Sequence, residues 1–321
     1  MNRLTKNMGI KLNLAVGILL ANFGGVALGQ AESVAAYMSP AELVRVAVAN
    51  EIASSNTDTN FMFRDEKQAS DGSETKLVVE TRDAMVGLLI GINGHPLTPE
   101  QRRAEDERLA RLIKDPVEMK KKEKREKEDA DRTKRIVSAF PDAFLYEADG
   151  FAPGEEGLGA AGDKLVRLKF RANPQYSPPS HVEQILTGLE GYMLVDSQQK
   201  RIAKIDGTLV KEVGFGWGIL GHLDRGGHFI VQQADMGQGH WEITQLDLSF
   251  TGKALFFKTL NIKEKEVFSC FQLAPRNLSF AEGVELLKKQ EAQMAQNPKA
   301  QTETKTEKIS RAMPRPPGAL R

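Results

Sequence analysis

Apolar and polar residues alternate through much of the segment from Leu189 to Phe271. A period of two is typical of β-strands, whose side chains point to opposite faces of a sheet in turn. Residues that favour turns interrupt the alternation at 197–200, 224–227, 236–239 and 251–252. Turns this short join antiparallel neighbours, so the segment predicts a run of β-hairpins in one antiparallel sheet.

The turn lengths predict which residues share a face. Closing the hairpins with these loops pairs Leu220 with Val231, Phe229 with Leu246, and Leu246 with Phe257. One face then collects seven apolar residues, with His222, Thr244 and Thr259 among them: Leu220, Phe229, Val231, Leu246, Leu248, Leu255 and Phe257. The other face is mixed, because Gln232, Gln245, Asp247 and Lys258 interrupt its apolar residues. The first face is predicted to be buried, against a core or an apolar ligand.

Helices and further strands are expected on both sides of this segment. Pro40-Ala41-Glu42 opens a helix that runs to Ala53, since proline suits the first helical position. Strands and short helices are predicted elsewhere from period and turn signals: strands at 60–66, 74–81, 84–92, 144–146 and 164–170, and helices at 182–187 and 280–290. The fold class is therefore α+β, with a strongly curved antiparallel sheet, an open half-barrel, packed on helices.

A charged helical arm is expected to interrupt the strands over about residues 98–140. Thr98 can cap its start, Pro116 is expected to kink or break it, and Pro141 to end it. Residues 119–135 have almost nothing to bury and should be solvated. Its basic cluster is a candidate contact for anionic lipid or an envelope protein: Lys120, Lys121, Lys122, Lys124 and Arg125. Interleaved acids favour the alternative of a simply solvated helix.

The two ends of the chain have different compositions from its centre. Residues 1–13 are basic and residues 14–28 almost entirely apolar or small, which predicts a secretory signal peptide at 1–29. No cysteine stands directly after the expected cut, as a lipoprotein would require, so we expect an exported protein, periplasmic or secreted, that is not a lipoprotein. A single half-barrel domain is predicted over 30–290, and a disordered, basic, proline-containing tail over 291–321.

Composition limits the function classes. A chain of 321 residues with 40% hydrophobic content can bury a sizeable core, and its net charge of +1 offers no general attraction for nucleic acid. Cys270 is the single cysteine, so the fold depends on its core rather than on disulfides. We expect Cys270 to be a small buried apolar residue.

Histidines suggest a metal site that the predicted registers do not support. His222 and His228 fall on opposite faces, and His240 lies one strand length away from His228. Ser-His-Asp patterns and phosphate-binding loops also lack supporting sequence, so we predict no catalytic residue, no metal and no cofactor.

Several stretches resemble a known superfamily. They are Leu165–Pro174, Val182–Thr187, Gly191–Asp196 and Arg201–Ile205. In their order and spacing they are similar to the half-barrel superfamily of bacterial lipoprotein carriers of the LolA/LolB type, over about residues 33–290. The resemblance implies a curved sheet around helices, with an apolar concavity that holds acyl chains in some members. The charged arm departs from the compact carriers.

Two functional hypotheses follow from the sequence, with a hydrolase ranked last. The first is an exported, non-catalytic envelope protein that binds lipid or acyl chains on the seven-residue apolar face. The second is an envelope scaffold or interaction module that acts through the charged arm and the tail, with the apolar face only a core.

Overall fold

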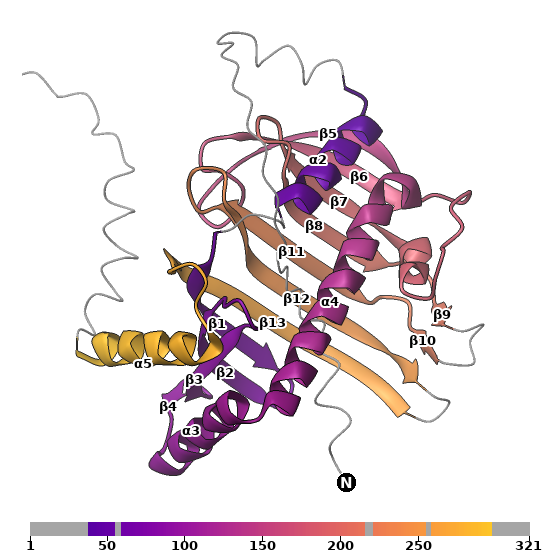
Figure 1. Ribbon diagram of the computed structural model, residues 1–321. Helices are drawn as coiled ribbons and strands as arrows, with labels where there is room; N and C mark the ends of the chain where they lie inside the picture. Colours follow the sequence, from indigo (N-terminus) through magenta and orange to yellow (C-terminus); the bar gives the residue numbers. More distant parts are fainter. Residues whose placement is uncertain (1–37, 55–58, 216–220, 255–257, 297–321) are drawn as a thin grey trace, which may run out of the picture.

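The structure, a computed structural model, describes residues 38–54, 59–215, 221–254 and 258–296 (Figure 1). Within them the fold is α+β, as predicted: one antiparallel sheet of 13 strands, not closed into a barrel, with helices against it. The predicted signal peptide, and the tail beyond residue 296, lie outside the described residues.

The helices begin where the sequence places its caps and prolines. Thr98 and Gln101 form a reciprocal capping box, and the Asp115 side chain caps the next helix ahead of Pro116. The helices are α2 (Pro40–Ser54), α3 (Pro99–Lys114), α4 (Pro116–Ala143), the 3₁₀ helix η1 (Glu183–Gly188) and α5 (Phe280–Gln296).

The strands follow one another with short turns for most of the chain. They are β1 (Phe61–Ala69), β2 (Gly72–Val79), β3 (Val86–Ile92), β4 (His95–Pro96), β5 (Phe144–Pro153), β6 (Lys164–Ala172), β7 (Leu189–Asp196), β8 (Ile202–Leu209), β9 (Val213–Phe215), β10 (Gly221–Leu223), β11 (His228–Asp235), β12 (Trp241–Ala254) and β13 (Lys258–Leu273). Their order in the sheet is β4-β3-β2-β1-β13-β12-β11-β8-β7-β6-β5, and β9 and β10 attach beside β12.

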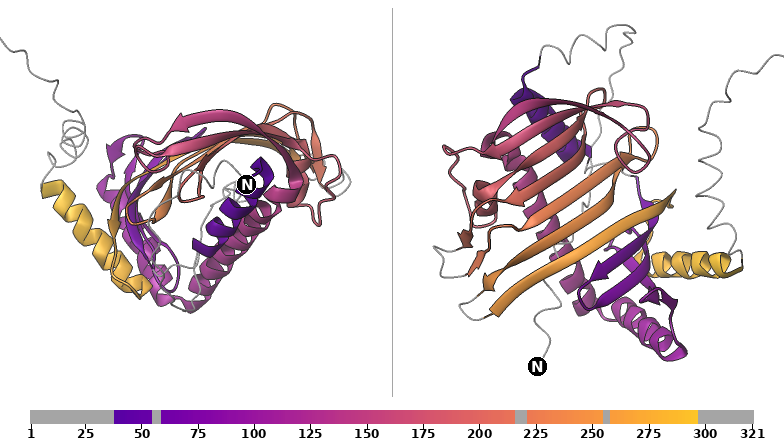
Figure 2. Two further views of the ribbon diagram at one scale, coloured as in Figure 1. Left: turned by 90° about the horizontal axis from the view of Figure 1, so that it is seen from above. Right: turned by 180° about the vertical axis from the view of Figure 1, so that it is seen from behind.

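The sheet bends into an arc whose concave side faces α2 and α4 (Figure 2). Helix α2 packs against α4 and against β5, β7 and β8. Its buried side chains Leu43, Val44, Ala47 and Val48 join the core on this side. A row of cross-strand partners forms the floor of that core, from β6 to β12: Leu168, Met193, Ile205, Val231 and Leu246.

A second core lies on the convex face, where β1, β2 and β3 carry their apolar side chains. Leu77 and Leu88 are partners, as are Val79 and Val86, and these side chains pack in one cluster with residues of α5 and α3. Helix α5 covers this side of the sheet (Figure 2). Apolar residues therefore change faces between β12 and β2, and β13 and β1 lie at the crossover.

The charged arm lies against the protein. Helix α4 runs across the open side of the arc (Figure 2), and Met119 reaches the convex-face core. The backbone N–H of Met85 donates to Glu126 at 3.0 Å. The prediction that Pro141 ends the helix is wrong: α4 continues to Ala143, which is buried with Phe140 in the concave-side core.

The predicted hairpin at residues 224–227 is also wrong. Strands β10 and β11 both pair with β12 in the same antiparallel direction, so the segment between them is a bulged continuation along one edge of β12. Gly227 passes so close to the Phe250 ring that an added Cβ would lie 2.3 Å from it. His222 consequently pairs with Lys253 rather than Phe229, and shares the convex face with it.

The hairpin that follows is longer than predicted. Strand β12 continues through Thr251 and Gly252 to Ala254, which pairs with Lys258, so the predicted turn at 251–252 is wrong. Phe250 pairs with Ile262, and Leu248 with Glu264.

Two further predictions need correction. Helix α5 extends to Gln296 rather than ending at residue 290, because Glu291 pairs with Arg102 and Met294 contacts the convex-face core. Cys270 is exposed rather than buried: it has a φ of 56° in the part of β13 where the register with β1 shifts. No helix among the described residues combines the length and apolar character needed to cross a bilayer.

Candidate functional site

An apolar strip occupies the concave face on β11 and β12. Val231 pairs with Leu246, and Phe229 with Leu248, so these four predicted binding residues lie on one face as expected. Each pair differs from the predicted partner by two residues, which leaves the face unchanged. The other three residues of the predicted set, Leu220, Leu255 and Phe257, lie outside the described residues.

Exposure divides the strip. Leu246 and Leu248 are buried at 5% and 6% exposure, and so belong to the concave-side core. Phe229 and Val231 are only half-buried. Leu260 and Ile262 of β13 join them on this face. The sequence did not predict this, because the turn predicted at 251–252 gave β13 a different register with β12. Both are half-buried and pack against the same core.

Two neighbouring glycines shape the floor beside the strip. Gly191 pairs with Gly207, and Gly207 pairs with Phe229. A Cβ added to Gly207 would lie 2.4 Å from the Phe229 ring, so the ring rests over the glycine backbone. The missing side chains let Phe229 lie flat toward β8. Sequence inspection alone does not show this, because the three residues meet only through long-range pairing.

Charged residues end the strip on the β13 side. Glu264 and Glu266 are the partners of Leu248 and Leu246, and the Lys67 Nζ of β1 lies 2.8 Å and 2.9 Å from their carboxylates. Burial disfavours the charged form of Lys67, but the two carboxylates outweigh it and raise the pKa of the ammonium. The triad, hereafter the Lys67 triad, carries one net negative charge beside the apolar floor.

Two half-buried carboxyl groups elsewhere in the fold have raised pKa values. Burial raises the pKa of Glu80, which follows β2, to about 7, with a backbone hydrogen bond to Phe61 opposing part of the rise. Burial also raises the pKa of Glu242 on β12 to about 8, with a further contribution from the Glu80 charge. Neither residue stands out in the sequence, since folding alone brings them together.

The arm's basic cluster is largely paired along its own helix. Lys121 lies 2.7 Å from Glu118, Lys122 pairs with Glu126, and Lys124 lies 3.8 Å from Glu128. A hollow of about 1070 Å³ separates the C-terminal half of α4 from the segment around Tyr176. Its lining is rich in charges of both signs and shares no residue with the apolar strip.

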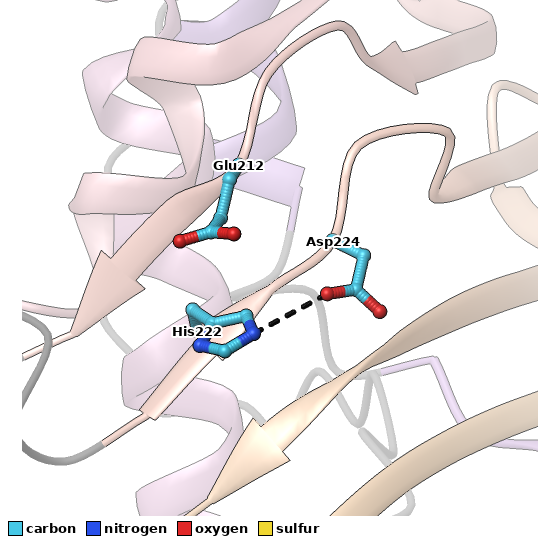
Figure 3. A group of neighbouring side chains, drawn as sticks. All are labelled: Glu212, His222 and Asp224. Atoms are coloured by element: carbon cyan, nitrogen blue, oxygen red, sulfur yellow. Dashed lines mark ion pairs between the residues drawn. The ribbon is translucent and has the colours of Figure 1, made fainter.

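The three histidines considered from sequence each have a different environment. The Nε2 atom of His228 lies 2.9 Å from Asp206 Oδ1, and the His240 ring lies edge-on to Phe61. The Nε2 atom of His222 lies 3.3 Å from Asp224 Oδ1, with Glu212 beside them (Figure 3). The pattern of histidines in the sequence does not predict this grouping, because two of its three members are carboxylates. The spacing of His222 and Asp224, two residues apart on one face, was the available signal.

Comparison with known proteins gives a distant likeness among solved structures. No family model matches the chain, and no curated protein matches it. Among solved structures, the chain is similar to a DUF1329 family protein from Desulfovibrio piger ATCC 29098, whose crystal structure was determined at 1.75 Å resolution. The two share 9% sequence identity over 76% of this chain and 97% of that chain, with a TM-score of 0.28.

Proposed function

We propose that the protein is an exported, non-catalytic envelope protein that binds a lipid or acyl chain on the concave face of its sheet. One observation carries the proposal. The apolar floor continues from the strands under α2 onto β11 and β13, where Phe229, Val231, Leu260 and Ile262 keep part of their surface exposed. Apolar side chains that remain accessible beside a closed core offer a binding surface of the kind that acyl chains use.

The dimensions of the strip suit an extended chain. The apolar floor that runs from β8 through the strip to β13 crosses three interstrand spacings, ~14 Å in all. Each methylene group that such a ligand buries contributes ~0.8 kcal/mol. Affinity would thus come mainly from the hydrocarbon, with little demand for specific polar contacts.

The Lys67 triad affects which charge the headgroup of the ligand can carry. Its net negative charge borders the strip at Leu246 and Leu248. A cationic or neutral headgroup fits beside it better than an anionic one, because like charges repel strongly where water is partly excluded. Export is supported by the N-terminal pattern of the sequence. The resemblance to half-barrel lipoprotein carriers supports the same reading.

The test compares two neighbouring residues on opposite faces. Val231→Gln places an amide on the strip, whereas Ile230→Gln places the same group on the convex face, between Asp206 and Asp247 in the ladder. Delipidated protein is titrated with a fluorescent long-chain monoacylglycerol, whose headgroup is neutral. The first variant should bind about tenfold more weakly, since ~1.5 kcal/mol of apolar burial is lost. The control should bind like the wild type.

Equal affinities for both variants, or no saturable binding by the wild type, would overturn the proposal. Thermal melts check that the two variants are equally folded. Native mass spectrometry of protein purified from its source envelope adds an independent readout. Co-purified lipid is expected, and bare protein that captures an envelope protein instead would favour the scaffold hypothesis.

A further inference from the structure

We propose that Glu212, His222 and Asp224 bind a divalent transition-metal cation on the convex side of the sheet, away from the apolar strip. One imidazole nitrogen and two carboxylate oxygens lie within 4.8 Å of one another (Figure 3). The Nε2 atom of His222 and the Oδ1 atom of Asp224 are 3.3 Å apart. Ligand atoms that each lie ~2.1 Å from a shared ion are separated by about this distance.

The backbone of His222 is fixed on both sides. It pairs with Gly214 of β9 and with Lys253 of β12, so β10 is the middle strand of three. A Cβ added to Gly252 would lie 2.1 Å from the His222 carbonyl oxygen, which shows how closely the strands approach. The imidazole therefore projects from a rigid support, as metal ligands generally do.

Asp224 is oriented by a neighbouring strand. Thr251 Oγ1 donates to its Oδ2 atom at 2.7 Å, and its backbone N–H donates to the Thr251 carbonyl at 2.9 Å. The Oδ1 atom is left facing His222. Hydrogen bonds of this kind to a ligand carboxylate hold it in a geometry suited to a metal.

The remaining donor comes from the entry to β9. Glu212 is exposed and can adjust its side chain to a cation held by the other two residues. A set of one imidazole and two carboxylates suits Zn²⁺ or Mn²⁺ better than Ca²⁺ or Mg²⁺, because the latter two ions prefer ligand sets made of oxygen atoms alone. Three protein donors leave the other coordination positions to water. The exposed Lys253 is the cross-strand partner of His222, and its positive charge should weaken the binding of a cation.

The test uses the full chain, stripped of metal with a chelator, and Zn²⁺ or Mn²⁺ alone in isothermal titration calorimetry. One ion should bind per chain, and Zn²⁺ should raise the melting temperature of the wild type. His222→Ala should abolish binding, whereas His95→Ala, at an exposed site on β4, should leave it unchanged. Thr251→Val should weaken binding at least about tenfold, because it removes the support of Asp224.

Glu212→Gln keeps the test decisive if His222→Ala fails to fold, because Glu212 is exposed and its replacement should leave the melting temperature unchanged without metal. Lys253→Ser should tighten binding, since it removes a positive charge. The proposal is overturned if the wild type shows no saturable binding, or if Glu212→Gln and Thr251→Val both bind like the wild type.

Discussion

Replacing Glu242 with glutamine should make the fold less sensitive to alkaline pH. Burial raises the pKa of Glu242 to about 8, from an ordinary value of 4.5, and the charge of Glu80 adds to the rise. Between these pH values the folded protein holds a proton that the unfolded chain has already released. The contribution of Glu242 to the free energy of unfolding therefore falls as the pH rises from about 5 toward 8.

The size of the effect follows from the difference between the two pKa values. A difference from 4.5 to about 8 sets an upper limit of ~5 kcal/mol on the contribution of Glu242. The side chain of Glu242 is half-buried, so screening by solvent reduces this contribution. We expect the free energy of unfolding to fall by ~2 kcal/mol between pH 5.5 and 8.5. Glutamine keeps the shape of the side chain and cannot ionise, so the free energy of unfolding of the variant should fall less over this pH interval.

Urea unfolding at pH 5.5 and 8.5 measures this difference directly. The wild type should lose more free energy of unfolding than Glu242→Gln does over the same interval, and the variant should be the more stable protein at pH 8.5. Glu285→Gln, at an exposed position on α5, is the matched control and should follow the wild type. If Glu242→Gln shows the same pH dependence as the wild type, Glu242 is not the group that titrates.

Three further substitutions test the packing. Glu51→Ala leaves the buried Arg201 without the carboxylate that it now contacts at 2.8 Å and 2.9 Å, and urea unfolding should show a loss of ~3–5 kcal/mol. Gly207→Ala should cost ~1–3 kcal/mol by forcing a Cβ against Phe229, and the double variant with Phe229→Ala should cost less than the two single changes combined. Thr98→Ala removes the cap of α3 and should lower the free energy of unfolding by ~1 kcal/mol. An unchanged midpoint of urea unfolding would mean that this cap does not stabilise the fold.

Local signals predicted the elements that depend on neighbouring residues alone. The turn after β3 is an example: Asn93 and Gly94 both have positive φ, at 52° and 75°, as a tight hairpin requires. The capping box at Thr98 is another, since its partners are three residues apart. In such cases the interactions that select the conformation join residues close in sequence, so the sequence pattern is enough to predict them.

Registers were harder to predict, because they depend on single extra residues. The loop between β11 and β12 holds five residues instead of four, and Thr244 adds a bulge to β12. Each error alone would have moved the strand to the other face, but two of them restored it. That is why Phe229, Val231, Leu246 and Leu248 were assigned to one face correctly while each partner was wrong.

The segment between β10 and β11 shows a different limit. Its Asp224-Arg225-Gly226-Gly227 sequence is compatible with a hairpin turn and equally with a bulge, since glycine suits both. Strand β8 decides between them, because it pairs with β11 along His228–Gln232 and takes the edge that a β10 hairpin would have occupied. The choice is made by residues about twenty positions earlier in the chain, which local patterns do not reveal. The grouping of Glu212 with His222 follows from a different pairing, that of β9 with β10.

The crossover of the apolar face explains why charged residues line part of the concavity. Strands β6 to β12 bury their apolar side chains under α2, whereas β1 to β3 bury theirs under α5 on the opposite side. The concave positions of Glu264 and Glu266 on β13 and of Lys67 on β1 therefore fall between the two cores and can be polar, and they form the Lys67 triad. An ion triad in a partly dry site stabilises little by itself, because desolvation offsets attraction. Under the proposed function, its position at the end of the apolar strip suits it to limit where a bound chain ends, rather than to support the fold.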